Sequence, residues 1–195
     1  MTANKQYYRT HRAIQSAFLT LLSRKPFEKI TVQDILDNTP VSRATFYKHF
    51  KDKYEIAEKI QEEILDARKE LRENLSQVHP GDLSVLVERY ATRYMDMGRL
   101  LLHVRTNQVD LPLALDLGSR EHYLSNSESP TRELEARIYG AAVSAMLVAI
   151  LEDSHQFPVE QMPMIMLPVV LHLLGLPDDP DVTRVIREKY SRKYG

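Results

Sequence analysis

Apolar residues recur at helical spacing along almost the whole chain, and short polar or proline-containing breaks separate the helical stretches. No segment keeps the alternation of apolar and polar residues that is typical of a strand. The pattern therefore predicts an all-α protein whose first helix runs from about Thr10 to Arg24.

Residues 31–53 contain two short amphipathic patterns joined by a tight turn. Thr31 is a suitable N-cap for the first helix. Its apolar positions, which share one helical face, are Val32, Ile35 and Leu36. Pro40 ends this helix, because the residue before a proline is displaced from the α region.

The second helix of the pair is expected to begin at Ser42 and to run through Phe50, with Phe46 and Phe50 facing inward. Its other sides carry Arg43, Ala44, Thr45, Tyr47, Lys48 and His49. A buried spine under polar and basic side chains is what a helix that reads the major groove requires. Helix-turn-helix pairs also occur in proteins that never contact DNA, so spacing alone leaves both interpretations open.

These residues also resemble a known family. The runs T-V-x-D-I and V-S-R-A-T-F-Y-K-H-F-K-D-K are similar to the DNA-binding signature of the tetracycline-repressor (TetR) family of bacterial transcription regulators. The resemblance covers about residues 7–65. It implies an N-terminal three-helix DNA-binding domain with a helix-turn-helix and a C-terminal helical ligand-binding and dimerisation domain. Family members commonly have glycine where this chain has Pro40, so a different type of turn is expected.

The resemblance assigns roles to individual residues. Arg43, Ala44 and Thr45 match base-reading positions, and Gln33 on the supporting helix also reaches a base. Arg43 is the candidate for a bidentate contact to guanine. The expected DNA-binding residues are Thr31, Gln33, Ser42, Arg43, Ala44, Thr45, Tyr47, Lys48, His49 and Lys53. Phosphate contacts are expected from Thr31, Tyr47, Lys48, His49 and Lys53, with further contacts from Lys5, Arg9 and Arg12. Core packing is the alternative for Tyr47, and a polar cap for His49.

Charge is divided unevenly along the chain. Residues 1–54 contain ten Lys or Arg and four Asp or Glu, a net charge of +6, which leaves −7 for the remainder of a chain whose net charge is −1. A basic end on an acidic body suits a protein that presents one end to a polyanion. We therefore divide the chain into a DNA-binding domain at 1–54 and a regulatory and dimerisation domain at 55–195.

The second domain is also expected to be helical. A long helix should begin near Asp52 and end at 79–81. The remaining predicted elements are helices at 82–94, 99–109, 111–117, 130–152, 158–175 and 181–194, with a polar loop at 118–130. Pro112 and Gly118 are expected to act as breaks, and Ser129 and Pro130 to open the helix at 130–152.

A homodimer is expected, through the helices near 130–152 and 158–175. The first has small residues on one side, namely Gly140, Ala141, Ser144, Ala145 and Val148, and the second is apolar all round. The TetR resemblance points to a four-helix dimer interface, and a purely intramolecular core is the alternative. Two DNA-binding domains would then bind a palindromic operator with half-sites about one helical turn apart.

The resemblance also implies a ligand pocket in the second domain and a small-molecule effector that releases DNA. The candidate lining residues are Tyr90, Tyr94, His103, Tyr123, Tyr139 and Met146; for each, ordinary packing is the alternative. Repression is the expected sign of regulation. The competing interpretation is a helical regulator that acts through a protein partner, without small-molecule control or with weak DNA affinity.

Composition excludes several other classes. The chain has no cysteine, so disulfides, thiolate metal sites and cysteine nucleophiles are excluded. The N-terminus lacks the apolar segment of a signal peptide and the longest apolar runs are shorter than a membrane span, so a cytoplasmic protein without membrane contact is expected. Glycine-rich phosphate loops, hydrolase and zincin motifs, and metal-like histidine spacing do not occur, so we expect no enzymatic activity and no cofactor.

Overall fold

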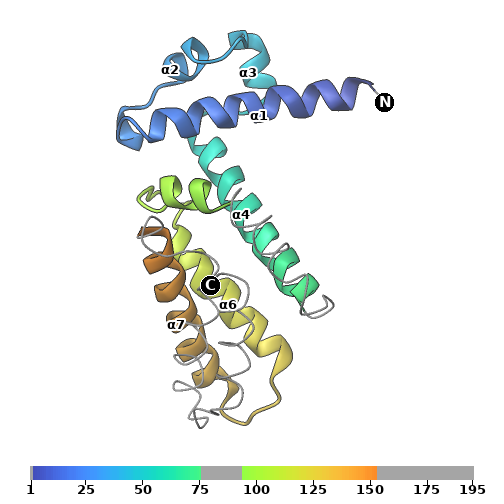
Figure 1. The fold of residues 1–195 in the computed structure, drawn as a ribbon, viewed down its shortest axis with the longest axis vertical. Coiled ribbons are helices and arrows are strands. Elements are labelled where there is room, and N and C mark those ends of the chain that lie inside the picture. Colours follow the sequence, from blue (N-terminus) through green and yellow to red (C-terminus); the bar gives the residue numbers. More distant parts are fainter. Residues whose placement is uncertain (1, 76–93, 153–195) are drawn as a thin grey trace, which may run out of the picture.

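The computed structural model describes residues 2–75 and 94–152, and within them the regular structure is helical apart from one isolated antiparallel bridge between Arg105 and Asp110. The elements are α1 (Thr2–Leu22), the 3-10 helix η1 (Phe27–Lys29), α2 (Val32–Asp37), α3 (Arg43–His49), α4 (Lys53–Leu75), a helical segment at 94–101, α6 (Leu111–Asn126) and α7 (Arg132–Glu152). The predicted all-α class is confirmed. Figure 1 shows α1 lying across the start of α4, α2 and α3 together on its far side, and α6 and α7 paired at the opposite end.

Side-chain caps fix where the three helices around the turn begin. Thr31 and Asp34 form a reciprocal capping box at the start of α2, and the Ser42 hydroxyl accepts the Thr45 N–H at the start of α3. Asp52 Oδ1 accepts the N–H groups of Tyr54 and Glu55 at 2.8 and 2.9 Å, which caps α4. These caps satisfy N–H groups that helix ends otherwise leave without partners.

The turn between α2 and α3 accommodates Pro40 without a glycine. α2 ends at Asp37, and Asn38 has φ −105° and ψ 10°, outside the left-handed region. The Thr39 hydroxyl oxygen then accepts the Val41 N–H at 3.3 Å. Because Pro40 has no N–H to satisfy, it fits this polar turn.

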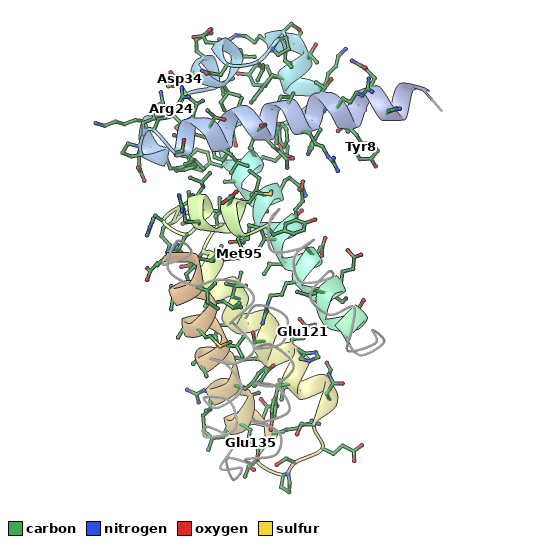
Figure 2. All side chains as sticks on the ribbon, in the orientation of Figure 1. Tyr8, Arg24, Asp34, Met95, Glu121 and Glu135 are labelled. Carbon is green, nitrogen blue, oxygen red and sulfur yellow. The ribbon has the colours of Figure 1, made fainter. Side chains whose placement is uncertain are left out.

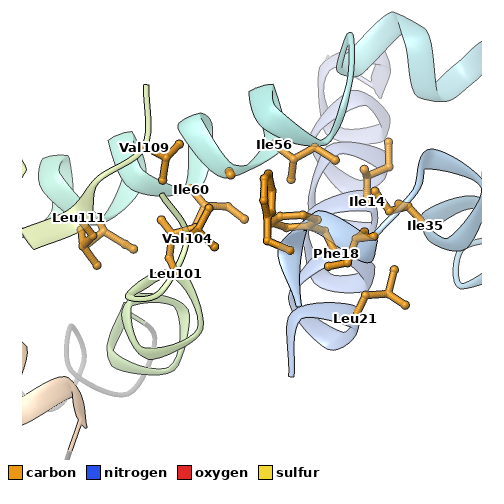
Figure 3. Close-up of a cluster of buried hydrophobic side chains, with 14 of the residues drawn as sticks. Ile14, Phe18, Leu21, Ile35, Ile56, Ile60, Leu101, Val104, Val109 and Leu111 are labelled. Carbon is orange, nitrogen blue, oxygen red and sulfur yellow. The ribbon is translucent and has the colours of Figure 1, made fainter. Parts of the chain in front are cut away.

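A single hydrophobic core runs from α1 through α4 into the segment after it (Figure 3). Its fully buried side chains are Ile14, Phe18, Ile30, Ile35, Phe46, Phe50, Ile56, Ile60, Leu101, Leu102, Val109 and Leu111. The inward placement predicted for Phe46 and Phe50 is therefore confirmed, with 0% and 1% of their surfaces exposed. The core does not stop at residue 54, because Ile56 and Ile60 belong to the same cluster as Leu101 and Leu111.

Polar contacts reinforce the junction between α4 and the following segment. Gln61, which is 9% exposed, donates from Nε2 to the Gln108 carbonyl at 3.2 Å and accepts the Asp110 N–H at Oε1 at 3.0 Å. Arg68 donates to the Ser119 hydroxyl at 2.8 Å. The residues before α6 and the middle of α6 are therefore attached to α4 by half-buried hydrogen bonds as well as by apolar packing.

α6 and α7 form a closely packed antiparallel pair. Gly140 of α7 is buried, and a Cβ at that position would lie 2.8 Å from the Asp116 carbonyl oxygen and closer still to the Asp116 and Arg120 side chains. The Ser144 hydroxyl donates to the Pro112 carbonyl at 2.7 Å. Glycine and serine here allow the two helix backbones to approach each other.

Several predicted boundaries are wrong, and the helix expected at 99–109 is instead helical only at 94–101. α1 begins at Thr2 rather than at Thr10, so its basic residues stand on a helix. Pro112 lies in the first turn of α6, where a missing N–H costs nothing, so it starts a helix rather than breaking one. Gly118 lies inside α6 with no atom near its missing Cβ, and the predicted loop at 118–130 is helical through Asn126. α7 begins at Arg132, two residues after Pro130.

By length and composition alone, α7 could cross a membrane. It is the only such helix within residues 2–75 and 94–152, and one helix of this kind is weak evidence for a membrane span. The predicted helix end at 79–81, most of the helix at 82–94, and the helices at 158–175 and 181–194 lie outside the described residues.

Candidate nucleic-acid interface

The exposed side of α3 carries the side chains expected to meet DNA. Arg43, Ala44 and Lys48 are exposed, and Tyr47 is 51% exposed while its ring packs edge-on against the Phe46 ring at 5.3 Å. Phe46 anchors the helix from below with no exposed surface. The helix therefore has the two faces that groove reading requires, one buried and one available.

Ser42 and Thr45 are part of the frame of α3 as well as candidate contacts. The two hydroxyls are 2.8 Å apart and hydrogen bonded, and the Ser42 Oγ accepts the Thr45 N–H at 3.1 Å. Thr45 is half-buried, whereas Ser42 is exposed. The N-terminal turn of α3, where the expected base readers lie, is thus held rigid by its own side chains.

Gln33 and Arg43 come from different helices and touch. Arg43 Nη2 donates to Gln33 Oε1, and Gln33 Nε2 donates to Asp37 Oδ1 at 2.7 Å. All three side chains are exposed on the helix-turn-helix. The structure therefore brings two of the four residues expected to read bases, Gln33 and Arg43, into contact.

Thr31 is engaged within the protein. Its hydroxyl and its N–H each lie 2.7 Å from Asp34 Oδ2, and its hydroxyl oxygen accepts the Asp34 N–H at 3.1 Å. Lys25 forms an ion pair with the same carboxylate at 2.7 Å. The Lys25 ammonium, followed by the Thr31 contacts, lowers the pKa of Asp34 to about 2. Figure 2 shows Asp34 at the α2 side of the domain. The expected phosphate donors of Thr31 are thus used in capping α2.

Lys53 does not project freely toward a phosphate. Its ammonium donates to the carbonyls of Phe27, Glu28 and Ile30 at 2.8, 2.9 and 2.9 Å, and it lies 4.6 Å from the Phe27 ring centroid. A lysine has three N–H donors, and all are used here. Burial lowers the pKa of Lys53 from its ordinary value. Its observed role is to fasten the loop before α2 to the start of α4, which differs from the expected phosphate contact.

His49 packs against α1. Its ring stacks on Tyr7 with 4.2 Å between centroids, and His11 lies 5.8 Å from it and 4.3 Å from Phe50. The Nδ1 atoms of both histidines are buried without a hydrogen-bond partner. Burial lowers the pKa of His49, and burial followed by the neighbouring His49 lowers the pKa of His11. This ring cluster ties the end of α3 to the N-terminal turns of α1.

The additional basic residues expected near DNA are all exposed on α1. Lys5, Arg9 and Arg12 follow one another at intervals of four and three residues and so share one helical face. They stand on a regular helix rather than on an extended arm.

The residues expected to line a ligand pocket do not converge. Tyr90 lies outside the described residues, Tyr94 packs beside the core, and Met146 is half-buried on α7. Tyr123 and Tyr139 form a ring pair at 5.3 Å, and the Tyr123 hydroxyl donates to Glu135 at 2.7 Å. Figure 2 shows Glu135 at the far end of the α6–α7 pair.

His103 belongs to a different feature, an open cavity of about 530 Å³ between the loop after α1 and the turn before α6. Its lining comes from Leu22, Ser23, residues 25–28, Arg99, Leu100, residues 102–104 and Glu152. Within the described part of the chain no group of three or more His, Asp or Glu side chains has the arrangement of a metal site.

Two residues that matter here were not singled out from the sequence. Asp34 follows Thr31 by three positions, the spacing of a capping box, which is a signal that could have been used. Asp37 follows Gln33 by four positions on α2, and that spacing places two side chains side by side on a helix.

Residues 14–60 match the family model described as bacterial regulatory proteins, tetR family. The N-terminal domain belongs to the TetR family. The match runs from Ile14 in α1 to Ile60 in α4 and so includes all three caps, the turn and the whole of α3. No curated protein matches the chain. The match supports a DNA-binding transcription regulator.

Proposed function

We propose that this TetR-family regulator is a repressor that binds a palindromic operator as a homodimer and is released by a small-molecule effector. The observation that carries the proposal is the exposed face of α3, with Arg43, Tyr47 and Lys48 set over a fully buried Phe46. Base-edge donors on a rigid helix supply sequence preference, and the surrounding basic residues supply phosphate affinity.

The proposed base-reading group is Gln33, Arg43, Ala44 and Thr45, and the proposed phosphate group is Tyr47, Lys48 and the exposed edge of His49. Ser42 supports both by capping α3. We leave Thr31 and Lys53 out of the direct contacts, because Asp34 and three backbone carbonyls already occupy their donors.

Dimerisation through α7 is supported by its outer face. Leu134 and Ile138 are 59% and 51% exposed, and Ala141 and Ala145 continue that face in the exposed class. The sequence pattern also predicts Gly140 and Ser144 at the dimer interface, but these two residues pack on α6. An exposed apolar stripe beside exposed alanines is suited to contact with a second copy of the helix.

We propose that an effector changes the position of the DNA-binding domain relative to the turn before α6. The cavity beside His103 is lined both by the loop after α1 and by the turn before α6. A ligand that favours one arrangement of these two segments would shift operator affinity through a coupling free energy, typically about 1–3 kcal/mol.

Binding of the purified protein to its own upstream DNA across a salt series tests the proposal. A footprint on a palindrome whose affinity falls steeply with salt is expected, because each neutralised phosphate releases counterions. Arg43→Ala should cost roughly 1–3 kcal/mol at one base pair of each half-site. Weak binding without sequence preference would contradict the proposal and favour the alternative, a regulator that acts through a protein partner.

A further inference from the structure

Three exposed side chains form a hydrogen-bonded relay that joins α2 to α3. Asp37 Oδ1 accepts from Gln33 Nε2 at 2.7 Å, and Gln33 Oε1 accepts from Arg43 Nη2. Ten residues separate Gln33 from Arg43, so this contact spans the turn rather than one helix. The relay ends at the residue proposed to contact guanine.

Asp37 and Arg43, at the two ends of the relay, fix the orientation of the Gln33 amide between them. An ionised carboxylate only accepts hydrogen bonds, and a guanidinium only donates them. The Gln33 amide has one accepting oxygen and one donating nitrogen, so a single orientation satisfies both neighbours: nitrogen toward Asp37 and oxygen toward Arg43. Without Asp37 the amide could rotate and present either group to Arg43 or to DNA.

Asp37 otherwise stands in an unfavourable place. It is the last residue of α2, where the helix dipole disfavours negative charge, and it is exposed in a domain of net charge +6. Asp34 and Asp52 of the same domain cap helices, whereas Asp37 caps none. The hydrogen bond to Gln33 is the interaction that gives this carboxylate a role.

We propose that Asp37 is a positioning residue for sequence recognition: it holds Gln33 so that Gln33 holds the Arg43 guanidinium for base reading. The inference rests on the proposed DNA-reading function and deepens it. Gln33 takes one of the five N–H donors of Arg43, and a pair remains for the O6 and N7 atoms of guanine. Gln33 and Arg43 therefore act as one reading unit rather than as two independent contacts.

Selection of duplexes from a random-sequence DNA pool by the full chain, parent and Asp37→Asn, tests the relay. Asparagine keeps the size of the side chain but can donate as well as accept, so it no longer fixes the Gln33 amide. We expect base discrimination at the position lost in Arg43→Ala to fall about tenfold in Asp37→Asn. Affinity for random duplexes should stay the same or rise, because a negative charge has left the basic domain.

Two further variants distinguish positioning from a general effect of charge. Glu28→Gln removes the same charge from an exposed residue of η1 that is not part of the relay, and it should leave discrimination unchanged. Asp37→Glu keeps an acceptor-only group and should retain discrimination to within about threefold. In an Arg43→Ala background Asp37→Asn should have no further effect on discrimination, because coupled residues are not additive.

The outcomes separate the relay from the function on which it rests. A parent protein that selects a palindrome while Asp37→Asn keeps the same base preference would overturn the relay alone. Equal losses in Asp37→Asn and Asp37→Glu would also overturn it. A parent protein that selects no sequence would overturn the proposed function, and the relay with it. If Asp37→Asn has a lower melting temperature than the parent, its effect is measured in the Arg43→Ala background. A further loss of DNA affinity there would indicate misfolding, because the relay no longer has a guanidinium to position.

Discussion

The DNA-binding domain and the α6–α7 pair are both helical, but they are built on opposite rules. In the domain, short helices are held by caps and by large buried side chains such as Phe46, and basic groups are left on the surface. In the pair, long helices approach through Gly140 and Ser144, and apolar side chains such as Ile138 are left exposed.

This difference explains why function can be predicted from the sequence of the DNA-binding domain and not from that of the α6–α7 pair. A helix that enters the major groove must keep a fixed pattern of buried and exposed residues, and residues 14–60 match a family model. Nothing comparable fixes the body, whose packing can be achieved with many combinations of apolar residues. The DNA-binding domain is therefore recognisable from its sequence pattern, whereas the packing of the α6–α7 pair is specific to this chain.

The largest effect should come from removing the anchor of α3. Phe46→Ala deletes a ring with no exposed surface, and we expect a loss of about 3–5 kcal/mol in the free energy of unfolding, measured in urea. Tyr47→Ala is the matched control, since half of that ring is exposed. It should leave most of the stability intact and weaken operator binding. Equal destabilisation by both changes would show that α3 does not have distinct faces.

A change in the α6–α7 pair should have the next largest effect. Gly140→Val places methyl groups against the Asp116 carbonyl and the Arg120 side chain, and it should cost about 1–3 kcal/mol in thermal or urea unfolding. Gly118→Ala is the control, because nothing lies near that position on the same pair of helices. It should stabilise by about 0.5–1 kcal/mol. A neutral Gly140→Val would contradict the close approach.

Lys53→Met should separate a fastening role from a phosphate-binding role. Methionine retains much of the apolar stem but loses the three bonds to carbonyls, so we expect a loss of about 1–2 kcal/mol in unfolding free energy. The slope of log affinity against log salt should stay the same. A slope that decreases by about one while stability is unchanged would instead identify Lys53 as a phosphate contact.

The smallest effect expected is a dependence of stability on mildly acidic pH. The pKa values of His11 and His49 are lowered by burial, so the unfolded chain takes up protons before the folded chain does. Stability from these rings is complete above their ordinary pKa of 6.5 and is lost as pH falls below it. Melting temperature measured against pH should show this decline. His11→Gln with His49→Gln should flatten it.

Sequence patterns predicted the helix-turn-helix accurately because its signals are local. Thr31 and Ser42 cap the two helices as expected, and Phe46 and Phe50 are buried as their spacing indicates. Those signals depend on backbone donors within three residues, so a linear sequence contains them.

The remaining features depend on contacts that a linear pattern does not contain. Pro112 reads as a break unless it is known to occupy the first turn of α6. The donors of Lys53 are used by carbonyls more than twenty residues away, and the rings beside His49 belong to α1. The surroundings of the ligand-pocket candidates depend on tertiary contacts too: Tyr123 and Tyr139 form a ring pair, and His103 lines an open cavity.

The continuous core around Ile56 and Ile60 bears on how this regulator could be recombined with others. Those two side chains belong to the DNA-binding helices and to the segment containing Leu101 and Leu111 at the same time. A chimaera joined at residue 54 would place a foreign α4 beneath α1 and break that shared packing. A joint beyond Ile64 would keep α4 beneath α1, and only the packing that Ile56 and Ile60 share with the segment containing Leu101 and Leu111 would have to be formed anew.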